Sequence, residues 1–557
     1  MIIGLSGQPA AAQDEVGAPT PIGGLGFVDE VEVRVVDVDV FVRDSAGRPV
    51  TGLDRDDFRL FQDGKDVPIS NFAVLSKEVF RSVFSPAPSD GAAAPAAAVA
   101  SPIEIRPIFV VLYLDNENLR PMDRNRVLRR VRSFVTENLE APVQMMVVSY
   151  QRSLDVAQPF TDDSRAVNDA LRGMTRMSGG VIERDNARRA IIADLQEAKE
   201  GTGASGRDQG PAAMRQRIYQ YADEEANNLS FTLGALRQTI AMLSGIEGRK
   251  SLVYVSSGLP MTPGLGLMQE YAAVFDDNSV MANRSILDRS RTFQELAAAA
   301  NAQQVSLYTI DAEGLNPVGG GDAESAYGRD PVAASSAEKN FKDSLRYLAD
   351  ATGGLAIINT NDVSAGLEKI AADLFDYYSL GYTLKSADRD RVHRLTVEVP
   401  GHPKYDLRYR RRFVEKSRET TIQDRVFSSL MVDVDDNPME LELTPGRPEP
   451  AAGAHWGVPL HLSFPLERVA LLEIGGDYVG RVVLFIGAQD LQGRSSEIQR
   501  QEHEVRIPAA DYEKALKQRF GIDFKLLLEE GRQRVSVGLM DEITRRASYN
   551  RIVVTVP

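Results

Sequence analysis

The hydrophobic residues of this chain follow two different spacings in its central part. Between residues 106 and 377, continuous apolar runs alternate with segments whose apolar residues recur every three or four positions. Continuous runs are typical of strands covered on both faces, and the wider spacing is typical of amphipathic helices. The expected strands are 108–114, 143–150, 154–160, 251–256, 305–310 and 354–358. The expected helices are 124–139, 164–174, 229–243, 292–303, 338–352 and 363–377. This order predicts an α/β domain with a mostly parallel sheet and helices on both faces.

On both sides of this core the pattern changes to the alternation of half-buried strands. We expect a small β module at 28–80 and further strands at 378–415, where the runs YYSLGYTL, HRLTVEVP and YDLRYRRRFV stand out. The segments 30–76 and 378–415 are expected to pack together, so that the core is inserted into one β-sandwich. The last part, 421–557, predicts a C-terminal β-sandwich that begins with a strand at SSLMVDVD (428–435) and has a helix only at 511–518.

Three segments interrupt these patterns. Residues 177–228 form a charged, helical insertion that we expect to cap one end of the sheet, and 81–105 are a Pro/Ala-rich linker. Residues 1–27 are either a disordered leader or the remnant of a signal peptide, because a short apolar piece is followed by small residues. This start favours an exported protein, periplasmic or extracellular. The sequence contains no run of about 18 apolar residues, so no transmembrane segment is expected.

The amino-acid composition excludes several kinds of partner and site. The formal net charge is -15, which argues against a nucleic-acid partner, because proteins that bind phosphate backbones usually present basic surfaces. The chain has no cysteine, which excludes disulfides, thiolate metal sites and a cysteine nucleophile. Its five histidines show no metal-ligand spacing, and no serine-hydrolase, zinc-protease or nucleotide-binding motif is present.

The first expected strand of the core ends in a possible binding site. The run IFVVLYLDNEN places Asp115 at the carboxyl end of a buried strand, followed by Asn116 and Glu117. In open α/β sheets, ligands bind outside the carboxyl ends of the strands. Asp115 and Glu117 are therefore candidates for a binding site at this edge of the sheet.

Several motifs, taken in order, resemble one family. They are GRPVTGLDRDDFRLFQDGK, IFVVLYLDNEN, GRKSLVYVSSGLP, LADATGGLAIINTNDVSAGLEKIAADLFDYYSLGYTL and LRYRRRFV. Together they resemble the von Willebrand factor type A (VWA) domain, and more closely the bacterial exported proteins called VWFA-related. The resemblance covers residues 30–415 and implies a Rossmann-like VWA domain flanked by β-sandwich-like modules. It also implies a metal-ion-dependent adhesion site built from D-x-S-x-S, a threonine from a later loop and an aspartate after the central strand.

This chain departs from the family's metal motif at most positions. Asp115 matches the first aspartate, whereas Glu117 and Leu119 stand in place of the two serines. Ser257 replaces the aspartate after the central strand. Leu119 cannot coordinate a metal, whereas Glu117 could do so directly or through water, and a pair of carboxylates would favour Ca²⁺ over Mg²⁺.

The position of the family's threonine is open between Ser230 and Thr232, because the insertion precedes it. Asp115, Glu117, Ser257 and Thr232 are thus the metal-site candidates. The alternative is that Asp115 accepts hydrogen bonds from the protein itself and the metal site is degenerate.

The sequence leads to three hypotheses of function. The first is a non-enzymatic exported protein that mediates protein–protein or cell-surface interaction through a VWA-like domain with a degenerate metal site and without a cofactor. The second is an adhesion module regulated by Mg²⁺ or Ca²⁺ through Asp115 and Glu117. The third, of another class, is a hydrolase without a recognisable motif. The partner expected under the first is a protein, whose identity the sequence does not give.

Overall fold

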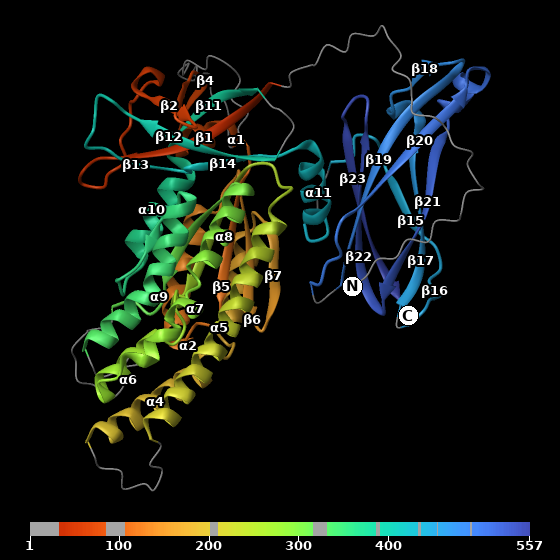
Figure 1. The fold of residues 1–557 in the computed structure, drawn as a ribbon. Coiled ribbons are helices and arrows are strands. Elements are labelled where there is room, and N and C mark those ends of the chain that lie inside the picture. The colour runs from red at the N-terminus through yellow and green to blue at the C-terminus, as the bar shows by residue number, and fades with distance from the viewer. Residues whose placement is uncertain are drawn as a thin grey trace.

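The chain is organised as a central α/β core flanked by two β-rich parts. The computed structural model describes residues 33–84, 106–200, 210–315, 331–385, 390–432, 436–453, 455–490 and 493–557. The core lies below a β module and beside a C-terminal β domain in Figure 1. The expected leader at 1–27 and the linker from residue 85 onward lie outside the described residues. The first residues assigned to the linker are helical, because they belong to α1 (Lys77–Phe84).

The core contains a six-stranded sheet in the order β10-β9-β8-β5-β6-β7. Neighbouring strands run parallel except β6 and β7, which pair antiparallel. The strands are β5 (Ile108–Asp115), β6 (Val143–Gln151), β7 (Ser153–Thr161), β8 (Arg249–Ser256), β9 (Val305–Asp311) and β10 (Ala356–Ile357). The three central strands β5, β8 and β9 are almost wholly buried, as their continuous apolar sequences require.

Helices cover both faces of this sheet. On one face lie α2 (Pro121–Asn138), α3 (Ser164–Met174) and α10 (Ser364–Phe375). On the other lie α5 (Pro211–Met242), α8 (Ser290–Ala302) and α9 (Pro331–Thr352). The predicted fold class, a Rossmann-like α/β core with flanking β modules, is therefore confirmed. No helix in the described ranges is long and apolar enough to cross a membrane.

The insertion is more continuous with the core than the sequence analysis expected. Helix α4 (Val181–Glu200) is followed by α5, a single helix of 32 residues. The separate helix predicted at 229–243 is therefore the second half of α5. The reason is that buried residues continue at helical spacing across the expected boundary, from Met214 and Ile218 to Leu229 and Leu233.

Further short helices pack beside the insertion. They are α6 (Leu265–Phe275), η2 (Asn278–Asn283) and α7 (Arg284–Leu287). Ile191 and Leu195 of α4 share a hydrophobic cluster with Met268 and Tyr271 of α6. This cluster holds α4 against the rest of the core at the end of the molecule that lies at the bottom of Figure 1.

The segments before and after the core form one sandwich of two four-stranded sheets. The sheet orders are β13-β1-β11-β4 and β14-β12-β2-β3. Leu75, at the end of β4, pairs directly with Tyr377, at the start of β11. The whole core is thus inserted where a hairpin turn would join these two strands. The strands of this module are β1 (Val33–Arg43), β2 (Arg59–Gln62), β3 (Lys65–Val67), β4 (Ile69–Leu75), β11 (Tyr377–Lys385), β12 (Arg391–Glu398), β13 (Asp406–Tyr409) and β14 (Arg412–Glu415), with η1 at Arg55–Asp57.

The run YDLRYRRRFV does not form the single strand that its pattern predicts. Its first half is β13, which pairs with β1 in one sheet, and its second half is β14, which pairs with β12 in the other. The chain changes sheets between Tyr409 and Arg412, because strands on opposite faces of a sandwich need different partners.

The C-terminal domain is a sandwich of two antiparallel sheets around one apolar cluster. Its strands are β15 (Glu442–Pro445), β16 (Glu449–Pro450), β17 (His455–Pro465), β18 (Leu472–Ile474), β19 (Asp477–Asp490), β20 (Gln499–Pro508), β21 (Arg519–Glu529), β22 (Gly531–Asp541) and β23 (Ala547–Val556). Short helical turns are η3 (Leu466–Arg468), η4 (Ala509–Asp511) and α12 (Tyr512–Ala515).

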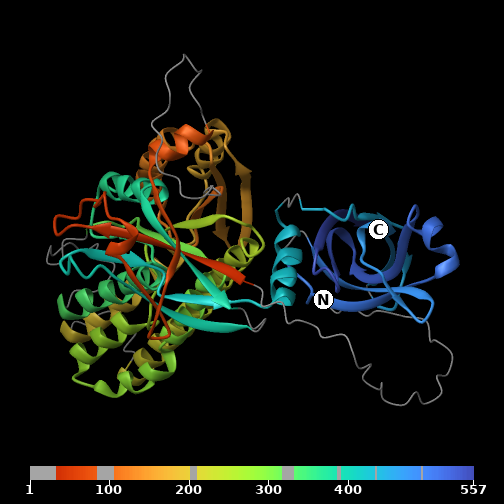
Figure 2. The same cartoon turned by 90° about the horizontal axis from the view of Figure 1, so that it is seen from above.

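The strand predicted at 428–435 is wrong in its described part, since Ser428 and Ser429 end helix α11 (Arg418–Ser429). Ser417 caps this helix by accepting a hydrogen bond from the backbone of Thr420 at 3.2 Å. Ile422 and Val426, one turn apart, pack on the C-terminal sandwich. Figure 2 shows α11 between the core and the C-terminal domain, where the Ser244 hydroxyl donates to the Asp424 carbonyl at 2.9 Å.

Candidate functional site

Asp115 lies at the carboxyl edge of the core sheet, where parallel strands end side by side. Leu114 of β5 is in register with Val255 of β8, so Asp115 comes next to Ser256. The Asp115 side chain is completely buried. A buried carboxylate must find hydrogen-bond donors, because it has lost its contact with water.

Neutral donors surround the Asp115 carboxylate. The Tyr254 hydroxyl donates to it at 2.5 Å and the Ser256 hydroxyl at 2.9 Å. The Asn118 amide donates to its two oxygens at 3.0 and 2.9 Å. Burial raises the pKa of Asp115, and the hydrogen bonds from Tyr254, Asn118 and Ser256 oppose this only in part.

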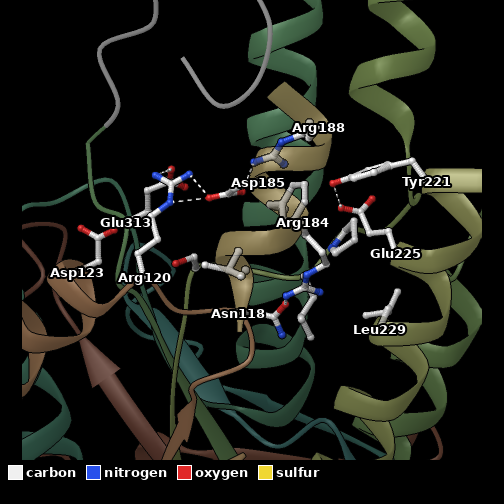
Figure 3. A pocket seen from close by; sticks show the side chains of 16 residues that line it. Asn118, Arg120, Asp123, Arg184, Asp185, Arg188, Tyr221, Glu225, Leu229 and Glu313 are labelled. Atoms are coloured by element: carbon white, nitrogen blue, oxygen red, sulfur yellow. Dashed lines mark hydrogen bonds and ion pairs between the residues drawn. The ribbon is translucent and has the colours of Figure 1, made fainter. Parts of the chain in front are cut away.

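Asn118 connects this buried acid to a positive charge. Its amide nitrogen donates to Asp115 and also to the Thr232 hydroxyl on α5, at 3.3 Å. Its amide oxygen accepts a hydrogen bond from Arg184 of α4 at 2.7 Å. The same Arg184 nitrogen donates to the Glu117 carbonyl at 2.8 Å, and Figure 3 shows the guanidinium beside Asn118. The Asn118 amide therefore lies between the Asp115 carboxylate and the Arg184 guanidinium group.

Glu117 turns away from this network. Its carboxyl lies against Gly180, where an added Cβ would come within 2.4 Å of Oε2, so a side chain at this position would displace the Glu117 carboxyl. Among the described residues Glu117 Oε2 is buried without a hydrogen-bond partner. Burial raises the pKa of Glu117, and the charge of Arg184 opposes this.

The predicted metal-site residues are only partly brought together. Thr232 reaches Asp115 through Asn118, whereas Ser230 donates back to the Ala226 carbonyl of its own helix at 2.8 Å. Thr232 is thus the hydroxyl at the site. In the described part of the chain, no hydrogen bond joins the side chain of Glu117 or Ser257 to Asp115.

The arrangement around Asp115 does not fit a divalent cation. Such an ion needs several oxygen ligands that converge on it, whereas Asp115 is met by an N–H and two O–H donors. Leu119 is fully buried in the core cluster on one face of the sheet, at the position where the family has a hydroxyl. In the described ranges, no group of three or more His, Asp or Glu side chains could hold a metal ion.

A small pocket opens above this network. Its volume is about 40 Å³, enough for a few waters or a carboxylate group. Side chains from α4 (Arg184, Asp185 and Arg188), from α5 (Tyr221 and Glu225) and from the loop after β8 (Ser257) contribute to its wall. Figure 3 shows these charged groups converging from separate elements.

A second buried acid lies at the same edge of the sheet, at the end of β9. Asp311 is 3.5 Å from the ammonium group of Lys342, which also donates to Asn359 at 2.8 Å. Burial raises the pKa of Asp311 to about 6, although Lys342 lowers it. The sequence analysis did not select either residue, because no local motif links them.

Asn118 and Arg184 were also missed. Asn118 occupies a position that the family motif leaves unspecified, and Arg184 is one of many charged residues in the insertion. Only the position of Arg184 in the first turn of α4, next to the predicted sheet edge, could have suggested it.

Comparisons with known proteins give weak likenesses of fold. No family model and no curated protein matches this chain. The similar solved structures include an aerotolerance-related membrane protein from Bacteroides fragilis, with 10% identity, a TM-score of 0.23, and coverage of 48% of this chain and 98% of that one.

They also include the vWF domain of the type V pili tip protein Mfa5 from Porphyromonas gingivalis, with 12% identity, a TM-score of 0.24, and coverage of 48% and 94%. Three N-terminal domains of Mfa5 match with 8% identity and a TM-score of 0.24, over 94% of this chain and 76% of that one. VWA-domain proteins are thus among the solved structures that this chain resembles. The fold described above rests on the strand order and packing of this chain itself.

Proposed function

We propose that this chain is a non-enzymatic, exported interaction protein. Its VWA-like core would contact a protein or cell-surface partner through the carboxyl edge of the sheet, with a metal-ion-dependent adhesion site that is degenerate.

The observation that carries this proposal is the surface built around the pocket. Two large apolar residues that are sequence neighbours of the wall residues Asp123 and Val181 are exposed: Met122 is 85% exposed and Ile182 is 48% exposed. Exposed apolar groups around a polar centre are typical of protein interfaces, in which methionine and arginine are enriched.

The positions of the polar groups argue against catalysis. His393 is buried in the β module between Asp63 and Glu415, at 2.8 and 3.2 Å. At the sheet edge, the Ser256 hydroxyl is engaged with Asp115 and has no histidine beside it among the described contacts. A nucleophile needs a base within hydrogen-bond reach. This arrangement supports binding over hydrolysis.

One observation favours the metal-regulated alternative. Glu117 Oε2 is buried without a hydrogen-bond partner in the described residues, and a cation could satisfy it. The neutral donors around Asp115 weigh against this alternative. Titration with divalent ions separates the two and is treated in the Discussion.

Cross-linking of the full chain in its native cells tests the proposed function. Ile182→Arg places a bulky charge beside the pocket, and Ile474→Arg makes the same change at an isoleucine of similar exposure, 50%, on the C-terminal domain. We expect Ile182→Arg to remove the cross-linked partner and Ile474→Arg to retain it. Equal recovery with both variants would contradict an interface at the sheet edge, and cell fractionation would test the export.

A further inference from the structure

Arg184 lies near the buried Asp115 at the carboxyl edge of the sheet and is linked to it through Asn118. Its contacts with Asn118 and the Glu117 carbonyl use one of its two terminal nitrogens. The guanidinium group has five N–H donors, so others remain available toward the pocket that Arg184 lines. Asp115 itself cannot reach it, because Asn118 lies between them.

The carboxylates of the pocket already have partners. Asp185 pairs with Arg120 at 2.7 Å and with Arg188 at 2.8 Å. Asp123 pairs with Arg126 at 3.2 Å. Glu313 lies 3.7 Å from Arg120.

Glu225 accepts hydrogen bonds from the Gly264 backbone at 2.8 Å and the Tyr221 hydroxyl at 3.3 Å. No carboxylate of a described residue forms an ion pair with Arg184, whose hydrogen-bond acceptors are both neutral. The guanidinium group of Arg184 therefore forms no ion pair with an acid of the described residues, although its charge lowers the pKa of the nearby Glu117.

Apolar side chains also line the pocket, among them Leu229, Leu259 and Phe341, and exposed apolar residues lie close to wall residues in the sequence. Met122 lies between the wall residues Arg120 and Asp123 in the sequence, and Ile182 lies between Val181 and Arg184. Leu315, which is 55% exposed, follows the wall residue Glu313 closely. An arginine surrounded by apolar contacts that exclude water binds a carboxylate more strongly than an arginine in open solvent.

We propose that Arg184 is a built-in cation in place of a metal ion, and that the pocket binds a partner's carboxylate flanked by apolar side chains. This inference rests on the proposed function and adds the chemistry of the partner. The pocket volume of about 40 Å³ suits one carboxylate group, with the apolar flanks beside the apolar side chains of the wall.

Two capped tripeptides test this chemistry on the full chain. N-acetyl-Leu-Glu-Leu-amide carries the carboxylate, and N-acetyl-Leu-Gln-Leu-amide has the same shape without the charge. Both are titrated by calorimetry in a buffer with a metal chelator. We expect the acidic peptide to bind saturably, about tenfold more tightly than the amide peptide, which corresponds to about 1.4 kcal/mol.

The matched variants are Arg184→Met, which keeps an apolar stem, and Arg189→Met, at an exposed arginine of the same helix. Arg184→Met should abolish the preference for the acidic peptide, and Arg189→Met should preserve it. Arg184→Lys, which keeps the charge, should retain part of it. If Arg184→Met fails to fold, the comparison of the two peptides on the unaltered chain still decides.

Three results would overturn the inference: no saturable binding of the acidic peptide, an unchanged preference in Arg184→Met, or binding that requires an added metal. If the peptides fail while Ile182→Arg still removes the cross-linked partner, the proposed function stands and only the role of Arg184 falls. If the cross-linking fails as well, both are wrong.

Discussion

Two buried aspartates at opposite ends of the core are held in different ways. Asp115, at the carboxyl edge of the sheet, is surrounded by neutral donors from its own domain. Asp373 of α10, near the β module, is 1% exposed and is held by Arg43 of β1, at 2.9 Å, and by Arg408 of β13. The first acid organises a loop within one domain, whereas the second joins two domains.

The two aspartates differ in the origin of the positive side chains around them. The two arginines at Asp373 belong to β1 and β13, which are distant in the sequence and pair within the β module, and they contact Asp373 where this module lies against the core. Arg249 reinforces the same junction, because it lies over the Tyr377 ring at 4.3 Å and 3.6 Å from Asp39. At Asp115, in contrast, the nearest positive group is kept one amide away, which leaves the guanidinium of Arg184 available at the pocket.

The largest effect is expected at the junction. Asp373→Ala leaves two largely buried guanidinium groups, 15% and 18% exposed, without their shared partner. We expect a loss of about 3–5 kcal/mol in the free energy of unfolding, measured by urea denaturation of the transition that unfolds the core. The control is Asp343→Ala, at an exposed pair with Arg346 on helix α9, which should change the free energy of unfolding by less than about 1 kcal/mol. Equal effects of both variants would show that Asp373 does not join the domains.

A smaller effect is expected at Asp115. Asp115→Asn replaces one acceptor oxygen with a donor group that faces the donors of Asn118, Tyr254 and Ser256. We expect a loss of about 1–3 kcal/mol, because buried donors lose their acceptor.

The size of this loss should depend on pH. The pKa of Asp115 is raised in the folded protein, so the folded state holds a proton that the unfolded state has lost above pH 3.8. The contribution of Asp115 to stability is therefore lost as the pH rises above that value, and this contribution is absent in Asp115→Asn. Urea denaturation at several pH values should show the gap between the two proteins narrowing as the pH rises. A gap that widens would contradict a raised pKa at Asp115.

The smallest effect is expected from metal ions. Calorimetric titration with Mg²⁺, Ca²⁺ and Mn²⁺ should give no heat of binding, and the melting temperature should not shift, because neutral donors already satisfy Asp115. A heat of binding that disappears in Asp115→Asn would instead support the metal-regulated alternative and make Glu117 a ligand.

Much of the fold could be predicted from local patterns. Each of the six apolar or alternating runs of the core became a strand of its sheet, because strands covered by helices need apolar residues on both faces. The errors lie where two elements compete for the same residues. The pattern did not show that α5 continues through the insertion, and the apolar residues near 428–432 were assigned to a strand although the Ser417 cap starts a helix before them.

The candidate site could be predicted only in part. Asp115 was selected because it ends a buried strand, whereas Thr232 was one of two alternatives, with Ser230, that the resemblance left open. Asn118 and Arg184 were not found, since their roles depend on the position of α4 over the loop after β5. Nothing in the spacing of these residues specifies that contact.

The sequence by itself determined the α/β alternation, the buried strand ending at Asp115 and the apolar residue Leu119 close after it. Tertiary structure decided which groups meet at that strand end and at the junction. The physical reason is the distance along the chain over which each effect acts. Hydrophobic periodicity reports on neighbouring turns and strands. Asn118, Thr232 and Arg184 come from separate segments that only the packing of α4 and α5 brings together.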